Sequence, residues 1–149
     1  VNLFMNIQQD FKEFLQLLEK HNVEYMIIGG YAVAFHGYPR FTKDIDIYYK
    51  LSEDNVKQLK KVLVEFGFKA SEVKPSLFKK ENVIKIGVEP VRIDLINDAD
   101  GITFGEAVKH IVRGKYGDQE VSFIDKKYLI LNKKSSNRDQ DKLDIKKLQ

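Results

Sequence analysis

The chain has 149 residues, 43% of them hydrophobic and 32% charged, which is typical of one globular domain with its own core. It contains no cysteine, which excludes disulfides and thiolate metal sites, and its formal net charge of +3 is too small to indicate a polyanionic partner. No apolar run approaches the roughly 18–20 residues that cross a membrane, and no signal-peptide pattern is found. We therefore expect a cytoplasmic protein without membrane contact.

The first predicted elements are a helix, a strand and a short second helix. Residues 7–20 carry apolar side chains at the spacing i, i+3, i+4 and i+7, which predicts an amphipathic helix. EYMIIG (24–29) predicts a buried strand that runs directly into Gly29 and Gly30. GYAVAFHG (30–37) then predicts a short helix that ends at a glycine.

A second strand and a longer helix follow. DIDIYY (44–49) alternates between polar and apolar side chains, which predicts a strand with Asp44 and Asp46 on one face. Ser52 is a suitable N-cap for the next helix, and Gly67 supplies a left-handed residue at its end.

Two alternating runs in the middle of the chain predict an antiparallel hairpin. VIKIGV (83–88) and VRIDLI (91–96) lie on either side of a Glu-Pro pair. On the second run, Arg92 and Asp94 point away from the core face because they alternate with three apolar residues.

The last third predicts a helix near 104–112, a short strand at 120–124 and two further helices. Asp125 can cap the first of these helices, and the second begins near Arg138.

Together the elements predict an α+β fold, with a small mixed sheet flanked by helices. No repeat and no long linker interrupts the pattern. We therefore expect one domain over residues 1–149, with helices within 125–149 packing on its core.

Three aspartates form the main candidate site. Asp44 and Asp46 share a strand face, and Asp94 joins them if its strand is the neighbour, about 4.8 Å away. When three carboxylates lie together without a cation, their repulsion raises the pKa of at least one of them. We therefore expect a metal, another positive group or a proton between them. Oxygen ligands of this kind favour Mg²⁺ or Mn²⁺. The alternatives are that Asp44 and Asp46 are only solvated and that Asp94 pairs with Arg92.

Gly29 and Gly30 are the second candidate feature. A strand that ends in glycines and opens a helix exposes backbone N–H groups that a phosphate can approach closely. The pair can also be an ordinary turn, and it is not a Walker A loop because no Gly-Lys-Ser/Thr follows. A phosphate-binding turn beside carboxylate-held metal ions is the equipment for phosphoryl or nucleotidyl transfer.

The order of these motifs resembles the nucleotidyltransferase superfamily typified by DNA polymerase β. Within it, IGGYAVAFHGYPRFTKDIDI (28–47) is similar to the small bacterial branch that includes abortive-infection-type nucleotidyltransferase toxins. LILNKKSSNRDQDKLDIKKL (129–148) is similar to the tail of the same branch.

The resemblance implies an enzyme that transfers an NMP from an NTP to an acceptor hydroxyl and releases pyrophosphate. It implies two Mg²⁺ or Mn²⁺ ions on Asp44, Asp46 and Asp94, with Asp94 as a candidate general base. It also implies that residues at the glycine turn, in the next loop and in the tail contact the triphosphate or the acceptor. These residues are Gly29, Gly30, Arg40, Thr42, Lys43, and Lys133 or Lys134.

Two departures from the superfamily leave the acceptor open. Gly30 stands where many members have serine, and the chain lacks the long region with which larger relatives recognise their acceptors. The candidate acceptors are an RNA such as a tRNA 3′ end, a protein or a small molecule. The alternative to catalysis is a binding module with the same fold, for instance one component of a toxin–antitoxin pair.

Two further groups each have two interpretations. His36 is either a hydrogen-bond donor behind the site or a histidine packed in place at a helix end. Arg138, Asp141 and Asp144 share one helical face and form either an ion-pair face that holds the tail on the core or a nucleotide contact.

Overall fold

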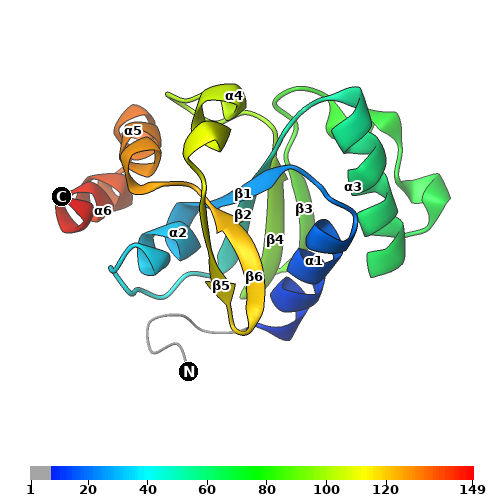
Figure 1. Cartoon of the computed structure of the whole chain (residues 1–149), viewed down its shortest axis with the longest axis horizontal. Helices are drawn as coiled ribbons and strands as arrows, with labels where there is room; N and C mark the ends of the chain where they lie inside the picture. The colour runs from blue at the N-terminus through cyan, green and yellow to red at the C-terminus, as the bar shows by residue number, and fades with distance from the viewer. Residues whose placement is uncertain (1–7) are drawn as a thin grey trace.

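The computed structural model describes residues 8–149, whose strands form one mixed sheet in the order β3-β4-β2-β1-β6-β5 (Figure 1). This arrangement confirms the predicted α+β fold with a mixed sheet flanked by helices. The strands are β1 Tyr25–Ile28, β2 Asp44–Tyr49, β3 Ile84–Val88, β4 Val91–Ile96, β5 Val112–Tyr116 and β6 Gln119–Phe123.

Most of the long helices fall into two groups, and α4 lies apart from both (Figure 1). In Figure 1, α1 and α3 lie side by side on the right, and α2, α5 and α6 lie together on the left. None of the described helices is both long enough and apolar enough to cross a membrane. The α-helices are α1 Gln9–Lys20, α2 Gly29–Phe35, α3 Glu53–Phe66, α4 Phe104–Ala107, α5 Lys126–Ser136 and α6 Asp139–Leu148. The 3₁₀ turns are η1 Ala70–Glu72, η2 Pro75–Phe78 and η3 Val108–His110.

Local capping signals account for several helix ends. The Ser52 hydroxyl accepts a hydrogen bond from the Asn55 N–H, and Gly67 ends α3 with φ +133°. The Asp125 carboxylate accepts a hydrogen bond from the Tyr128 N–H at the start of α5. The predicted first position of α1, residue 7, lies outside the described residues.

The predicted helix near 104–112 is wrong in its second half. The chain forms only the short α4 and the turn η3, and then enters β5, which pairs with β6 in antiparallel register. The Phe35 ring stacks on Phe123 and fills the space where a Cβ on Gly114 would lie. A tertiary contact with α2 and a strand partner therefore override the local pattern.

Strand β2 lies between β1 and β4, and this position organises the site. It pairs antiparallel with β1 and parallel with β4. The parallel register places Asp46 opposite Asp94 and Asp44 opposite Arg92. Because paired residues share a face of the sheet, all four charged side chains emerge on the same side. Their apolar neighbours Ile45, Ile93 and Leu95 are buried in the core.

Candidate active site

The three predicted aspartates converge into what we call the carboxylate triad: Asp44, Asp46 and Asp94. One carboxylate oxygen from each can lie within 4.8 Å of the other two. The convergence follows from the β2–β4 register, which places two of them directly opposite on neighbouring strands. The prediction that the strands of Asp46 and Asp94 are neighbours is therefore confirmed.

Arg92 supplies a positive charge to two members of the triad. Its Nη2 lies 2.7 Å from Asp44 Oδ2 and 3.0 Å from Asp94 Oδ2, and its Nε lies 2.9 Å from Asp94 Oδ1. The pairing of Asp94 with Arg92 that we considered as an alternative does occur. It does not separate Asp94 from the triad, because the same guanidinium also reaches Asp44.

Asp46 is the member of the triad without such a partner. Its burial, together with the negative charges of Asp44 and Asp94, raises its pKa to about 7, although Lys133 and Arg138 act in the opposite direction. The expectation of a positive group among the carboxylates is confirmed by Arg92. The raised pKa of Asp46 means that this acid binds a proton more readily than an ordinary aspartate does.

The glycine turn lies directly against the triad. Gly29 has φ +70°, and a Cβ at this position would overlap Asp46 Oδ2. A Cβ on Gly30 would lie 2.8 Å from Thr42 Oγ1 and 3.2 Å from Arg40 Nη2. The glycines thus allow a carboxylate and the following loop to approach the backbone, a role that no local sequence signal indicates.

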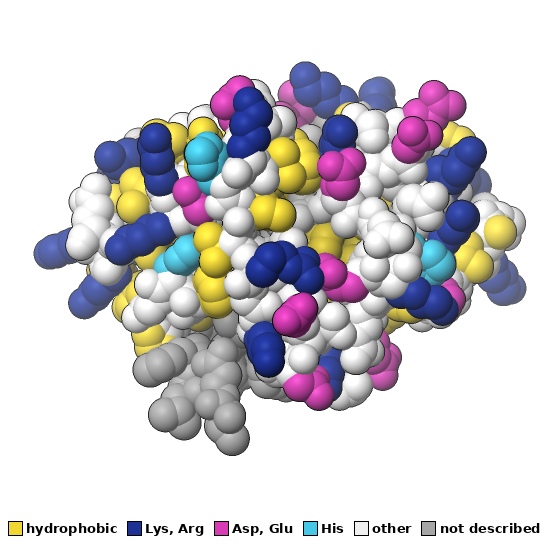
Figure 2. Space-filling model, viewed as in Figure 1, with side chains coloured by type: hydrophobic (Ala, Val, Ile, Leu, Met, Phe, Trp, Pro, Cys, Tyr) yellow, Lys and Arg dark blue, Asp and Glu magenta, His cyan; other side chains and the backbone are white. Residues whose placement is uncertain are grey.

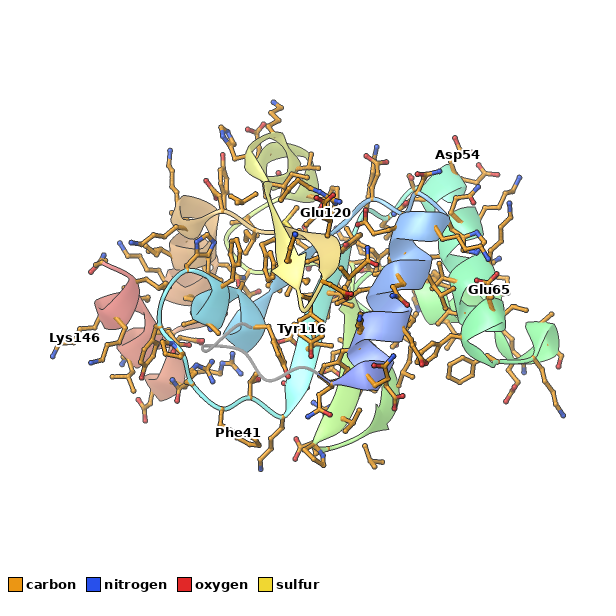
Figure 3. The ribbon with its side chains drawn as sticks, turned by 60° about the horizontal axis from the view of Figure 1, so that its bottom comes forward. Phe41, Asp54, Glu65, Tyr116, Glu120 and Lys146 are labelled. Atoms are coloured by element: carbon orange, nitrogen blue, oxygen red, sulfur yellow. The ribbon has the colours of Figure 1, made fainter. Side chains whose placement is uncertain are left out.

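The loop between α2 and β2 brings three predicted residues to the site. The Thr42 hydroxyl donates a hydrogen bond to the Asp44 carbonyl, and the exposed Lys43 ammonium lies 3.6 Å from Glu89 Oε2. Arg40 reaches across to the C-terminal helix, where its Nη2 donates to Asp144 Oδ2 at 3.1 Å. In contrast, the Phe41 ring points outward from the loop (Figure 3).

The C-terminal helices and the loop before β2 together contain a second group of charges, which we call the tail cluster: Arg40, Lys133, Arg138, Asp141 and Asp144. Lys133 is 3% exposed, and its Nζ lies 3.2 Å from Asp141 Oδ1 and 2.9 Å from Asp144 Oδ2. Arg138 Nε donates to Asp141 Oδ2 at 2.9 Å. These contacts confirm the ion-pair face that we considered for the tail.

Opposite effects act on the pKa of Asp141. Burial alone raises it, but hydrogen bonds from Arg138 and Lys133 and the charge of Lys133 outweigh the burial, so that this pKa lies below its ordinary value.

The outer faces of α5 and α6 carry several exposed lysines, including Lys146, which points away from the site (Figures 2 and 3).

A cleft of about 610 Å³ joins the triad, the glycine turn and the tail cluster. All nine of the following predicted site residues line it: Gly29, Gly30, Arg40, Thr42, Lys43, Asp44, Asp46, Asp94 and Lys133. Lys134 is exposed and does not line it. His36 is packed in place, with Nε2 2.8 Å from the Ile124 carbonyl oxygen, as one of its two interpretations predicted.

Sequence reasoning missed several residues of the cleft. Asp98 and Asp100 follow β4 in a tight turn, and Asn132 from α5 donates a hydrogen bond to the Asp100 carbonyl. The polar residues that follow VRIDLI in the sequence could have indicated these two acids. Their place in the cleft, however, depends on the contact with α5. The further lining residues not predicted for the site include Glu89, Ser136 and Gln140.

The family model of the aminoglycoside-2''-adenylyltransferases matches residues 10–148 of this chain. The chain belongs to this family. Membership confirms the predicted nucleotidyltransferase superfamily and makes the chain a nucleotidyltransferase. The similarity to the abortive-infection-type branch stays a resemblance of motifs. A search of curated proteins gave no match.

Solved structures of nucleotidyltransferases share this fold. The lincosamide antibiotic adenylyltransferase LnuA, solved with lincomycin bound, is 18% identical, with a TM-score of 0.60 over 97% of this chain and 98% of that one. A Thermotoga maritima protein assigned as a nucleotidyltransferase is 14% identical, with a TM-score of 0.61 over 92% and 88%. An antigenic nucleotidyltransferase-like protein from Paracoccidioides brasiliensis is 14% identical, with a TM-score of 0.54 over 93% and 72%.

Proposed function

We propose that the chain transfers the adenylyl group of ATP to a hydroxyl of a small, polar, aminoglycoside-like molecule and that this transfer requires Mg²⁺. The observation that carries the proposal is the carboxylate triad, which lies against the glycine turn in a cleft whose other wall is cationic. The choice of ATP and of this acceptor class follows the family to which the chain belongs.

The triad fits a divalent cation. Its three carboxylates offer only oxygen ligands, which hard ions such as Mg²⁺ and Mn²⁺ prefer, and Arg92 shows that two of them already surround a positive charge. Asp44, Asp46 and Asp94 would hold the ions. When bound, the ions supply positive charge for the departing pyrophosphate and increase the acidity of the acceptor hydroxyl.

In the proposed reaction the acceptor oxygen attacks the α-phosphorus of ATP. The bond between this phosphorus and the oxygen bridging to the β-phosphate breaks, and pyrophosphate leaves with the electron pair. Asp94, held from one side by Arg92, accepts the proton of the hydroxyl. The N–H groups of Gly29 and Gly30, with Arg40, Thr42, Lys43 and Lys133 around them, hold the phosphates.

Two observations support a small acceptor. Glu89, Asp98 and Asp100 add negative charge to the cleft lining, which suits the amino groups of an aminoglycoside. The LnuA chain, named as an antibiotic adenylyltransferase, is matched over 98% of its length, so that a chain of this size needs no additional region for acceptor binding.

The test is transfer from α-labelled ATP with Mg²⁺ to a panel of aminoglycosides, with lincosamides and tRNA as separate arms. We expect labelled aminoglycoside with the wild type and none with Asp46→Ala. Asp54→Ala, an exposed acid on α3 far from the cleft (Figure 3), is the matched control and should be fully active. Equal labelling by the wild type and Asp46→Ala would contradict the proposal.

The other arms decide between the remaining acceptors. Labelled tRNA without labelled antibiotic would favour the RNA-modifying alternative. If the wild type bound neither ATP nor a divalent ion in a calorimeter, the binding-module alternative would replace catalysis.

A further inference from the structure

We propose that Asp144 is a positioning residue, which holds Arg40 and Lys133 together beside the glycine turn so that both cations bind the β- and γ-phosphates of the nucleotide. This inference rests on the proposed function, because it concerns the same cleft.

Asp144 is the point at which two distant parts of the chain meet. Its side chain is fully buried. Its Oδ2 forms an ion pair with Lys133 Nζ at 2.9 Å and accepts a hydrogen bond from Arg40 Nη2 at 3.1 Å. Its Oδ1 accepts from Gln140 Nε2 at 2.8 Å, and Arg40 Nε lies 3.1 Å away. One carboxylate from α6 therefore fixes a cation from the loop before β2 and a cation from α5.

Both cations keep donor capacity toward the cleft. A guanidinium has five N–H groups, and the described contacts of Arg40 that meet hydrogen-bond geometry use Asp144 and, at 3.4 Å, the Phe41 carbonyl. Its buried Nε lies 3.1 Å from Asp144 Oδ1, so the donors left for a ligand are on the two Nη atoms. Lys133 has three N–H groups, of which the acids Asp141 and Asp144 take two.

The position of these cations suits the far end of a triphosphate. Arg40 Nη2 lies 3.2 Å from the site of a Cβ on Gly30, so the guanidinium borders the turn. The tail cluster contains three cations and two acids, so it keeps a positive charge on the wall opposite the triad. A β- or γ-phosphate that lies against both the glycine turn and Arg40 would receive charge-assisted hydrogen bonds from the backbone and from the guanidinium.

Asp141 differs from Asp144 in a way that assigns the positioning role. Asp141 accepts hydrogen bonds from the backbone N–H and the side chain of Arg138, which lies three positions before it. Asp141 therefore caps the start of its own helix, α6. Asp144 instead joins side chains from the loop before β2, from α5 and from α6, and it is the acid that connects Arg40 to the C-terminal helices. Lys133 is the only partner that the two acids share among the described ion pairs.

The test compares Asp144→Asn with Asp144→Glu, which keeps the charge but displaces the carboxylate. ATP, pyrophosphate and adenosine serve as separate binding probes in calorimetry, and KM for ATP and kcat are measured below the unfolding temperature of every variant. We expect both variants to bind ATP and pyrophosphate about ten- to a hundredfold more weakly, with adenosine binding unchanged and KM affected more than kcat. Asp139→Asn, an exposed acid of the same helix, is the control and should stay within about twofold of wild type.

Each outcome decides the inference. Unchanged pyrophosphate affinity in a folded Asp144 variant would overturn it, and so would weaker adenosine binding of equal size, which indicates general damage. If neither variant folds, Asp144 is structural and the inference is wrong. Failure of the wild type to bind ATP would instead remove the proposed function, so the two failures are distinguishable.

Discussion

The carboxylate triad and the tail cluster line the same cleft and contain the same kinds of charged groups. The pKa values of their acids are nevertheless shifted in opposite directions. In the triad one guanidinium contacts two of the three carboxylates, and the pKa of the third, Asp46, rises to about 7. In the tail cluster two carboxylates share three cations, and the pKa of Asp141 falls.

Charge balance explains the difference. Burial raises the pKa of both acids, so burial alone does not distinguish them. At Asp46 the charges of Asp44 and Asp94 outweigh those of Lys133 and Arg138, whereas the charged partners of Asp141 are the cations Lys133 and Arg138. A cluster with an excess of acids has affinity for added positive charge, whereas a cluster in which every acid has a cationic partner holds its own elements together.

The largest effect that would test this comparison is on catalysis. Asp94→Asn removes one charge from the triad and the candidate base, and we expect transfer to fall by about a hundredfold or more. Because the triad has excess negative charge, the same change should leave the free energy of unfolding nearly unchanged. Stopped assays of labelled product and thermal unfolding measure the two effects. Retained activity would show that the triad is not the reaction centre.

The next effect is on stability and belongs to the tail cluster. Asp141→Asn leaves Lys133 and Arg138 short of one negative charge, and we expect it to lower the free energy of unfolding by roughly 3 kcal/mol at pH 7. Because the folded-state pKa of Asp141 is depressed, this contribution is present above the unfolded-state pKa and is lost as pH falls through the folded-state value. Urea unfolding at pH 7 and at low pH measures the difference. Asp139→Asn is the control, and an equal loss at both pH values would contradict the ion-pair assignment.

The smallest effect has the opposite sign and belongs to Asp46. With a folded-state pKa of about 7, this acid binds a proton more tightly in the folded than in the unfolded chain, so stability falls as pH rises from about 4 to about 7. Asp46→Asn removes this loss. We expect the variant to unfold several degrees above wild type at pH 8 with chelator and at the same temperature near pH 4. A variant less stable than wild type at pH 8 would mean that Asp46 is already neutralised by its neighbours.

Local patterns predicted the parts of the fold that depend on neighbours in sequence. The alternation in DIDIYY predicted β2 with its correct bounds, and capping by Ser52 and Asp125 predicted the starts of α3 and α5. Strand β5 was missed because its short run contains Arg113 and Gly114. Its pairing with β6 and its contact with Phe35 are properties of the folded chain.

The sequence by itself determined that Asp44 and Asp46 share a face, since side chains alternate along any strand. It also determined that a glycine pair precedes them and that the motif order is that of a nucleotidyltransferase. Only the tertiary structure decided that Arg92 bridges two carboxylates, that Asp46 fills the place of a Cβ on Gly29, and that Asp144 joins Arg40 to Lys133. These contacts depend on strand register and on the packing of α6, which bring together residues far apart in the chain and leave no periodic signal in the sequence.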